Sequence, residues 1–183
     1  MLIRTLPILL SLIWHANTGY AQQSGDEGRM RVTDSAGNVP ALSATSSITG
    51  DSIVAFAKTL IGVPYKYCSV TPETGFDCSG FVNYVFGHFG IKVPRSSVDF
   101  THEGVTVALS ECAPGDLVLF KGTHRHTKVV GHIGIVTANE YGVVSFIHST
   151  SGDAYGVMIS RVEGVYMKRF VKVIRMGPLP GRG

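Results

Sequence analysis

Apolar residues recur at helical spacing after Asp77, and this pattern organises the prediction for the whole chain. The repeating positions are Phe81, Val82, Val85, Phe86 and Phe89. Together they form one apolar face of a helix. Asp77 is a preferred N-cap residue, and Gly90 stands where a C-terminal cap belongs. We therefore predict a buried helix whose first turn contains Cys78.

Two later runs, residues 131–137 and 143–149, are rich in β-branched and aromatic residues and predict strands. The segment 138–142 between them has a turn-type composition, so the two strands form a hairpin. If the hairpin is centred near Glu140, residues whose numbers sum to about 280 face each other across the ladder. We therefore expect His132 to lie directly opposite His148, on the same face of the sheet.

The remaining pattern predicts two more helices and three more strands. Residues 52–61 form an amphipathic helix that Gly62 closes, and a short helix opens at Pro94 and contains Phe100. A turn at 113–116 leads into a strand at 117–121. Strands near 156–160 and 168–174 complete the sheet.

The polar and apolar segments also predict how the chain is organised. Residues 1–21 read as a signal peptide: Arg4 is followed by an apolar core at 6–14, and Gly19-Tyr20-Ala21 suits a signal peptidase. We expect cleavage near Ala21 and export to the periplasm or the exterior, with an uncleaved anchor as the alternative. The apolar core is too short for a permanent membrane span.

Composition then separates a leader from a domain. Residues 22–50 are rich in small polar residues and predict a flexible leader. The patterned region 51–176 is expected to form one domain, and residues 177–183 a C-terminal tail. The net charge of the 183-residue chain is only +3, without a basic run, so a nucleic-acid partner is not indicated.

Cys78, His132 and His148 are the residues with candidate chemistry. A helix N-terminus favours an anion, so we expect a lowered pKa for Cys78 and a thiolate–imidazolium pair with His132. His148 would hold the His132 ring in its productive orientation. A cysteine, a base and an orienting group form an activated-nucleophile site. The alternative is a core cysteine with two unrelated strand histidines.

Several separated strings of the sequence together resemble one known family, the NlpC-type cell-wall endopeptidases. The strings are GVPYKY (62–67), GFDCSGFV (75–82), VPRSS (93–97), PGDLVLF (114–120), GHIGIV (131–136) and FIHST (146–150). These enzymes are papain-like cysteine peptidases that cut peptide stems of bacterial peptidoglycan. In this resemblance Cys78 matches the nucleophile, His132 the base and His148 the third polar residue. Tyr65 matches the tyrosine beside the catalytic centre, as an oxyanion or orienting group.

The resemblance implies a papain-like α+β fold, in which helices pack on an antiparallel sheet and the nucleophile begins a helix. It also implies cleavage between γ-D-glutamyl and the diamino acid of the stem. An amidase or acyl transferase that uses the same site, or a catalytically silent wall-binding protein, remains the alternative. Relatives usually have Gly-Gly where this chain has Cys68-Ser69, so the shape of that loop is open.

The motif order places five polar residues around Cys78 as candidate substrate contacts: Tyr65, Asp77, Ser79, Arg95 and Ser96. A guanidinium suits a stem carboxylate because it donates in a bidentate fork, although Arg95 is equally compatible with a solvated surface charge. We expect Asp77 to cap its helix through one oxygen and to present negative charge to a free L-Ala amine. Stem peptides released from glycan should then be preferred.

The remaining cysteines and histidines leave further alternatives. In an exported protein Cys68 and Cys112 could form a disulfide or stay free. His124 and His126 could ligate zinc or lie in a solvated loop at the rim of the site, and we favour the loop because further ligands are lacking. We expect a monomer that needs no cofactor or metal.

Overall fold

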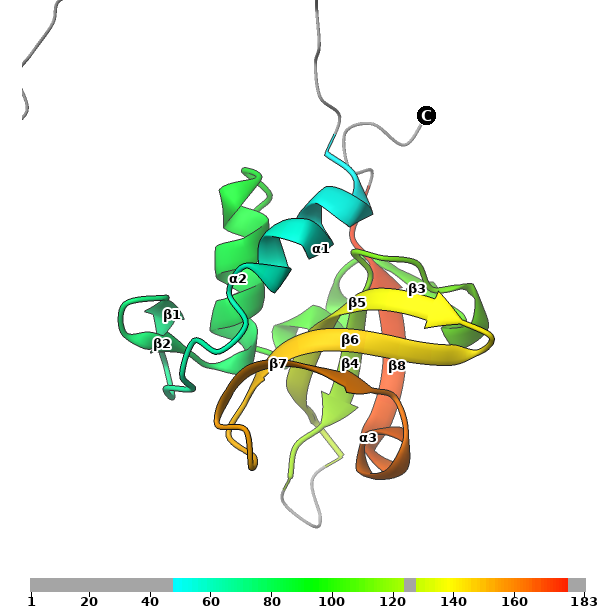
Figure 1. The fold of residues 1–183 in the computed structure, drawn as a ribbon. Coiled ribbons are helices and arrows are strands. Elements are labelled where there is room, and N and C mark those ends of the chain that lie inside the picture. Colours follow the sequence, from blue (N-terminus) through cyan, green and yellow to red (C-terminus); the bar gives the residue numbers. More distant parts are fainter. Residues whose placement is uncertain (1–47, 124–127, 178–183) are drawn as a thin grey trace, which may run out of the picture. The chain divides into compact units, whose positions relative to one another are not determined.

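The computed structural model describes residues 48–123 and 128–177. Their main feature is a six-stranded antiparallel sheet with the strand order β3-β8-β4-β5-β6-β7 (Figure 1). The strands are β3 (Val105–Val107), β4 (Leu117–Lys121), β5 (Val130–Glu140), β6 (Val143–Thr150), β7 (Gly156–Arg161) and β8 (Phe170–Arg175). β5 and β6 form the hairpin that carries the two candidate histidines.

Helices α1 (Gly50–Lys58) and α2 (Cys78–His88) lie together on one side of the sheet (Figure 1). A short hairpin of β1 (Val70–Thr71) and β2 (Gly75–Phe76) leads into α2, and α3 (Gly164–Arg169) connects β7 to β8. Two 3-10 turns, Asp99–His102 and Leu109–Glu111, flank β3. The observed helices and antiparallel sheet confirm the predicted α+β class.

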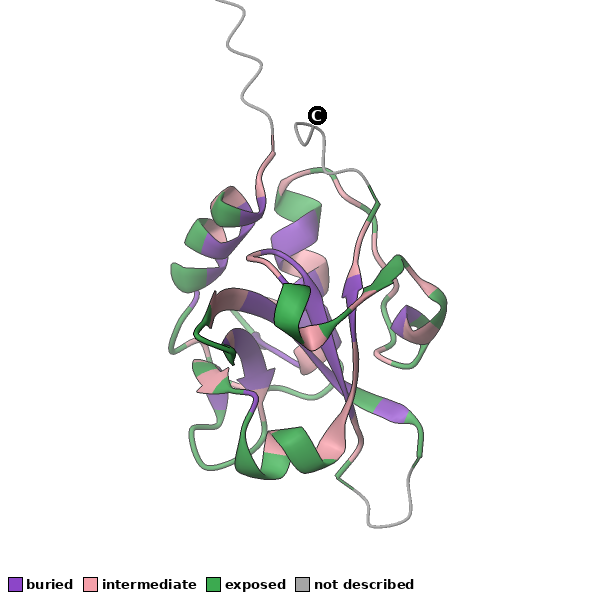
Figure 2. Cartoon of the chain, turned by 90° about the vertical axis from the view of Figure 1, so that its right-hand side faces the viewer, coloured by how far each residue is buried: buried purple, intermediate pink, exposed green. Residues whose placement is uncertain are grey.

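Strand alternation divides the core into two clusters. Successive side chains of a strand point to opposite faces, so Leu117 and Leu119 pack with the helices, whereas Val118 and Phe120 pack on the other face. All four side chains are fully buried. Figure 2 shows the buried residues along the strands and on the inner sides of the helices. The sheet is therefore covered on both faces around β4.

Capping residues set where the helices begin. Thr49 and Ser52 form a reciprocal capping box, so α1 starts at Gly50 and ends at Lys58, earlier at both ends than the predicted 52–61. Asp77 caps α2 by accepting from the Gly80 N–H at 2.6 Å, which confirms its predicted cap role.

Three further elements differ from the predicted ones. The predicted helix after Pro94 is only the 3-10 turn at 99–102. Helix α3 was not predicted, and it occupies the start of the strand expected at 168–174, so β8 begins at Phe170. No helix in the described ranges is long and apolar enough to cross a membrane.

The β5–β6 hairpin also differs from prediction in its register. Its turn is only Tyr141-Gly142, both with positive φ (52° and 83°), as a type I′ hairpin turn requires. Ile135 pairs with Ile147, which displaces the ladder by two residues from the predicted register. His132 and His148 are therefore not directly opposed. They remain on one face because a shift of two residues keeps the side-chain alternation.

Candidate active site

Cys78 is the first residue of α2 and lies where two pockets meet. One pocket, of about 750 Å³, also contains His132, and the other, of about 430 Å³, contains the Asp77 and Arg95 side chains. Tyr65 and Gly131 line both pockets, as Cys78 does. The two pockets together form a groove that passes over the Cys78 thiol.

Burial has the largest influence on the pKa of Cys78 and raises it, and the adjacent Asp77 carboxylate raises it further. Hydrogen bonds from the backbone at Cys78, Ser79 and Ile133 act in the opposite direction but do not reverse the shift. The prediction of a lowered pKa is therefore wrong for the free protein. Cys78 rests as a neutral thiol, not as half of a thiolate–imidazolium pair.

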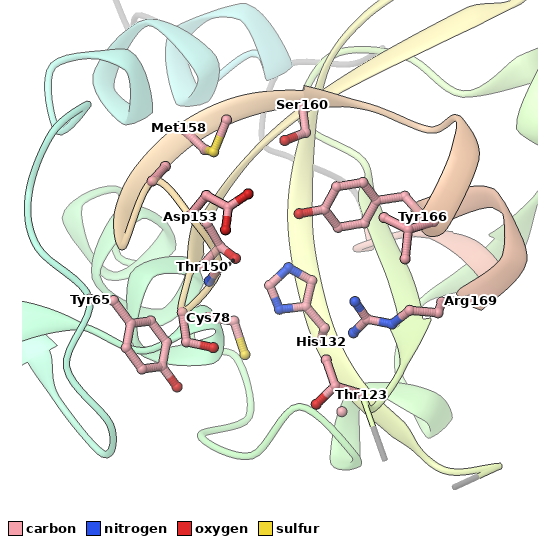
Figure 3. A pocket seen from close by; sticks show the side chains of 15 residues that line it. Tyr65, Cys78, Thr123, His132, Thr150, Asp153, Met158, Ser160, Tyr166 and Arg169 are labelled. Atoms are coloured by element: carbon pink, nitrogen blue, oxygen red, sulfur yellow. Dashed lines mark hydrogen bonds between the residues drawn. The ribbon is translucent and has the colours of Figure 1, made fainter. Parts of the chain in front are cut away.

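His132 and His148 are in direct contact. Nε2 of His132 lies 2.9 Å from Nδ1 of His148, and the rings are nearly perpendicular at 86°. Because His148 engages Nε2, the other ring nitrogen of His132, Nδ1, remains for Cys78. In Figure 3 the His132 ring lies beside the Cys78 thiol in the larger pocket. The three predicted residues are thus close together in space.

Two residues that the sequence analysis missed hold the far side of His148. Its Nε2 lies 3.0 Å from Ser160 Oγ on β7 and 3.4 Å from the Tyr166 hydroxyl on α3. The Tyr166 ring also packs against both histidine rings. Neither residue belongs to a recognisable motif, and their contact with His148 depends on the β6–β7 register and on the unpredicted helix α3.

Both histidines are neutral at physiological pH. Burial lowers the pKa of His132 well below its ordinary 6.5, and the charges of His148 and Arg169 add to the shift. Burial and then Arg169 lower the pKa of His148 to about 4. A neutral imidazole has one donor and one acceptor nitrogen. If Nδ1 of His132 is free to accept, its Nε2–H donates to His148, which then donates from Nε2 towards Ser160 or Tyr166.

Tyr65 lies beside Cys78 and packs edge-to-face on Tyr155, with ring centroids 5.6 Å apart. Burial raises the pKa of Tyr65, and the charges of Cys78 and Asp77 raise it further. The phenol therefore stays protonated. It can donate a hydrogen bond to an oxygen that gains negative charge near the thiol.

Asp77, Ser79 and Arg95 form a hydrogen-bonded network at one end of the smaller pocket. Arg95 donates to both Asp77 oxygens, at 3.0 and 2.6 Å, and to Ser79 Oγ at 3.0 Å. Ser79 Oγ and the Gly80 N–H also reach Asp77 Oδ1, at 3.3 and 2.6 Å. Arg95 therefore pairs with the Asp77 charge, and Asp77 still lines the pocket, so its contact with an L-Ala amine stays a prediction.

The same network limits Arg95 as a free carboxylate anchor, although both residues still line the groove. Ser96 also lines this pocket. The side chain of Ser96 forms no hydrogen bond with any described residue. The Ser96 hydroxyl, like the Tyr65 hydroxyl, is therefore free of described partners and can meet a ligand in this pocket.

Cys68 and Cys112, which could have formed a disulfide, do not pair. Cys68, Cys78 and Cys112 are all free thiols, with Cys68 exposed and Cys112 buried. Cys68 adopts a positive φ of 58°, the left-handed conformation that glycine takes more easily. Among the described residues no cluster of metal-ligating side chains occurs. His124 and His126 lie outside the described residues.

Comparison with known proteins gives a consistent result. A model of the NlpC/P60 family matches residues 62–176. The gamma-DL-glutamyl hydrolase of Bacillus subtilis is 37% identical over 124 residues, which cover 67% of this chain and 28% of that protein. The matched region covers between 23% and 46% of the length of such curated relatives.

Solved structures show the same fold. An NlpC/P60 family protein from Bacillus cereus aligns with a TM-score of 0.63 at 27% identity, over 72% of this chain and 41% of that chain. The NlpC/p60 domain of the peptidoglycan hydrolase SagA aligns with a TM-score of 0.56 at 28% identity, over 70% of this chain and 100% of that chain. The predicted papain-like α+β fold is confirmed.

Proposed function

Because the chain belongs to the NlpC/P60 family, we propose that it is a cysteine endopeptidase that hydrolyses stem peptides of bacterial peptidoglycan. One observation carries this proposal: Cys78 stands at the head of α2 beside the His132 ring, which His148 contacts from behind. A nucleophile, a base and a group that orients the base are the parts of an activated-nucleophile site.

Acylation of Cys78 is the first chemical step. Since Cys78 and His132 are both neutral at rest, the thiol proton moves to His132 Nδ1 as the sulfur adds to the stem carbonyl. His148 accepts the hydrogen bond from His132 Nε2–H and so keeps Nδ1 directed at the thiol. The ring of His148 is in turn oriented by Ser160 and Tyr166, whose hydroxyl oxygens contact its Nε2.

The oxyanion of the tetrahedral intermediate needs donors near Cys78. The backbone N–H of Cys78 lies at the start of α2, where peptide N–H groups have no partner within the helix. This N–H and the protonated Tyr65 hydroxyl are the proposed donors. Collapse of the intermediate breaks the C–N bond, and the proton on His132 goes to the leaving amine.

Deacylation reverses the roles. The thioester on Cys78 is attacked by a water molecule whose proton His132 accepts, and the thiol regains that proton when the acid product leaves. The proposed acylation and deacylation steps use only Cys78, His132, His148 and Tyr65 of this chain together with water.

We place the scissile bond between γ-D-glutamyl and the diamino acid of the stem. A relative named gamma-DL-glutamyl hydrolase, 37% identical, supports this choice. The acyl part of the stem would lie in the pocket with Tyr65, Ser79 and Ser96, where the Asp77–Arg95 pair forms a neutral polar wall.

We further propose that residues 1–21 direct export, so that the domain at 51–176 reaches the cell wall. The supporting features are the charge of Arg4, the apolar core at 6–14 and the small residues before Gln22. The family match at 62–176 lies inside this domain. Its substrate is found outside the cytoplasm, which agrees with export.

Product analysis tests the proposal. The protein is incubated with L-Ala-γ-D-Glu-diamino acid tripeptides and with muropeptides, and the products are identified by mass spectrometry. We expect the L-Ala-D-Glu dipeptide and the free diamino acid. Release of an intact stem from the sugar would instead identify an amidase, and products longer than the substrate a transferase. Binding without any product would identify a wall-binding protein.

A further inference from the structure

The two halves of the groove differ in how their charges are matched. In the smaller half, the guanidinium of Arg95 is paired with the Asp77 carboxylate at 2.6 Å. The larger half contains a second guanidinium, that of Arg169 at the end of α3, next to His132. Figure 3 shows the Arg169 side chain pointing into this pocket beside the His132 ring.

Arg169 has no anionic partner among the residues that the structure describes. Its only hydrogen bond there runs from Nε to the backbone carbonyl oxygen of Lys121, at 2.9 Å, so both terminal Nη groups remain free of described partners. The described residues form two ion pairs, Arg95 with Asp77 and Arg175 with Asp116, and Arg169 is in neither. The 124–127 segment adds no carboxylate, because its residues are His, Arg, His and Thr.

A partly buried guanidinium without an anionic partner raises the free energy of the folded protein. Arg169 is half-buried, and burial lowers its pKa, because desolvation disfavours a cation. Asp153 lies across the same pocket but forms no ion pair with Arg169. A partly desolvated guanidinium with a free fork of donors is a ready site for a carboxylate, which it can bind in bidentate geometry.

The chemistry of the proposed peptidase determines which part of the substrate reaches Arg169. His132 has to deliver its proton to the leaving amine, so the leaving amino acid lies in the half of the groove that His132 lines. We propose that Arg169 binds a free carboxylate of this leaving amino acid and so selects stems in which that carboxylate is not amidated. This inference rests on the proposed peptidase function.

A carboxylate at Arg169 would act on the reaction as well as on binding. The Arg169 charge is one cause of the lowered pKa values of His132 and His148. An anion bound to the guanidinium offsets this charge, so the pKa of His132 rises while the substrate is bound. His132 then becomes a stronger base when the thiol proton has to move. A substrate with a free carboxylate is therefore favoured twice, in binding to Arg169 and in proton transfer to His132.

Two tripeptides that differ only at the leaving residue test the proposal. Both are L-Ala-γ-D-Glu-diamino acid, one with free carboxylates on the diamino acid and one with these groups converted to carboxamides. For the wild-type protein we expect kcat/KM to be about tenfold to a hundredfold higher for the carboxylate form. Equal values for the two tripeptides would overturn the proposal without any variant.

Variants assign the preference to Arg169. In Arg169→Gln the ratio of the two kcat/KM values should fall to within about threefold of unity, and Arg169→Lys, which keeps the charge but not the fork, should retain part of it. The ratio cancels any change in histidine pKa that affects both substrates. Arg161→Gln removes the same charge from an exposed position of β7 outside the groove and should keep the wild-type ratio. An unchanged ratio in Arg169→Gln would contradict the assignment.

Binding to Cys78→Ala separates this inference from the proposed activity. Calorimetry with the same two tripeptides should show the carboxylate form binding more tightly, and this preference should vanish when Arg169→Gln is added. Selective binding without turnover by the wild type would support the Arg169 site and overturn the peptidase proposal. Equal binding of both forms would overturn the Arg169 site.

Discussion

His132 and His148 have different tasks in the proposed reaction, although they touch each other at 2.9 Å. His132 accepts and returns a proton, whereas His148 only orients it. We therefore expect His148→Gln to keep partial activity, with a loss of about tenfold to a hundredfold, and His132→Asn to lose about a thousandfold or more. The measurement is kcat/KM on one stem peptide. Equal losses in both variants would contradict the division of roles.

The buried histidines also predict how stability depends on pH. The pKa of His148 falls from 6.5 to about 4 in the folded protein, so between these values the unfolded chain binds more protons. Its contribution to stability is present above pH 6.5 and is lost as pH falls towards 4. This linkage is worth on the order of 2 kcal/mol between pH 7 and 4.5.

Urea unfolding at the two pH values measures this effect. The wild type should lose about 2 kcal/mol more than His148→Gln, because the variant lacks the titrating ring. The acid limb of the pH profile of kcat/KM should also lie below pH 6.5, since the pKa of His132 is lowered as well. The same loss of stability in both proteins would show that His148 is not the group that titrates.

At the residue scale, sequence reasoning identified groups but not their charge states. Cys78 could be predicted at a helix start and the two histidines on neighbouring strands, and the family resemblance of their motifs linked the three as a set. The raised pKa of Cys78 could not, because the burial that causes it depends on the packed structure. The same holds for the Asp77–Arg95 pair, whose members are 18 residues apart in sequence.

At the scale of elements, α2 has to approach the loop before β1 closely to present Cys78. A Cβ at Gly80 would overlap the backbone carbonyl oxygen of Ser69 and come within 2.9 Å of Asp77 Oδ1. We expect Gly80→Ala to reduce the free energy of unfolding by about 2 kcal/mol or more, as overpacking does. This change should also displace the Cys78 end of the helix.

Gly87 on the same helix is a matched control. A Cβ there meets no atom within 4 Å, so Gly87→Ala should stabilise the protein by about 0.5–1 kcal/mol through helix propensity. Both variants can be compared with the wild type by urea denaturation. Similar effects of the two substitutions would argue against a close approach at Gly80.

The β5–β6 hairpin shows why register is hard to predict. A turn of five residues and one of two residues are both compatible with the sequence at 138–142, and the structure has the shorter turn. Thr137 forms an irregularity between the pairs Val136–Phe146 and Ala138–Ser145. Such an extra residue changes which face the following side chains occupy. Both histidines share a face only with this irregularity in place, a feature that hydrophobic alternation does not reveal.

At the scale of the whole molecule, the site combines residues from the helical layer and from the sheet. Cys78 comes from the helical side and the histidines from the sheet, and the described residues all belong to one compact unit, whose first residue is Ala44. We therefore expect a chain that starts at Ala44 to keep the melting temperature and the kcat/KM of the full chain on free stem peptides. A large loss of either would show that the preceding residues contribute to the domain.

The central claim is that Cys78 is the nucleophile, and cysteine variants test it most directly. The measurement is kcat/KM on a stem tripeptide for Cys78→Ala, Cys68→Ala and Cys112→Ala, with folding checked by circular dichroism. We predict no detectable turnover by folded Cys78→Ala and near wild-type activity for the other two, because Cys68 and Cys112 lie in no proposed step. An active Cys78→Ala protein together with an inactive Cys68→Ala protein would contradict the account.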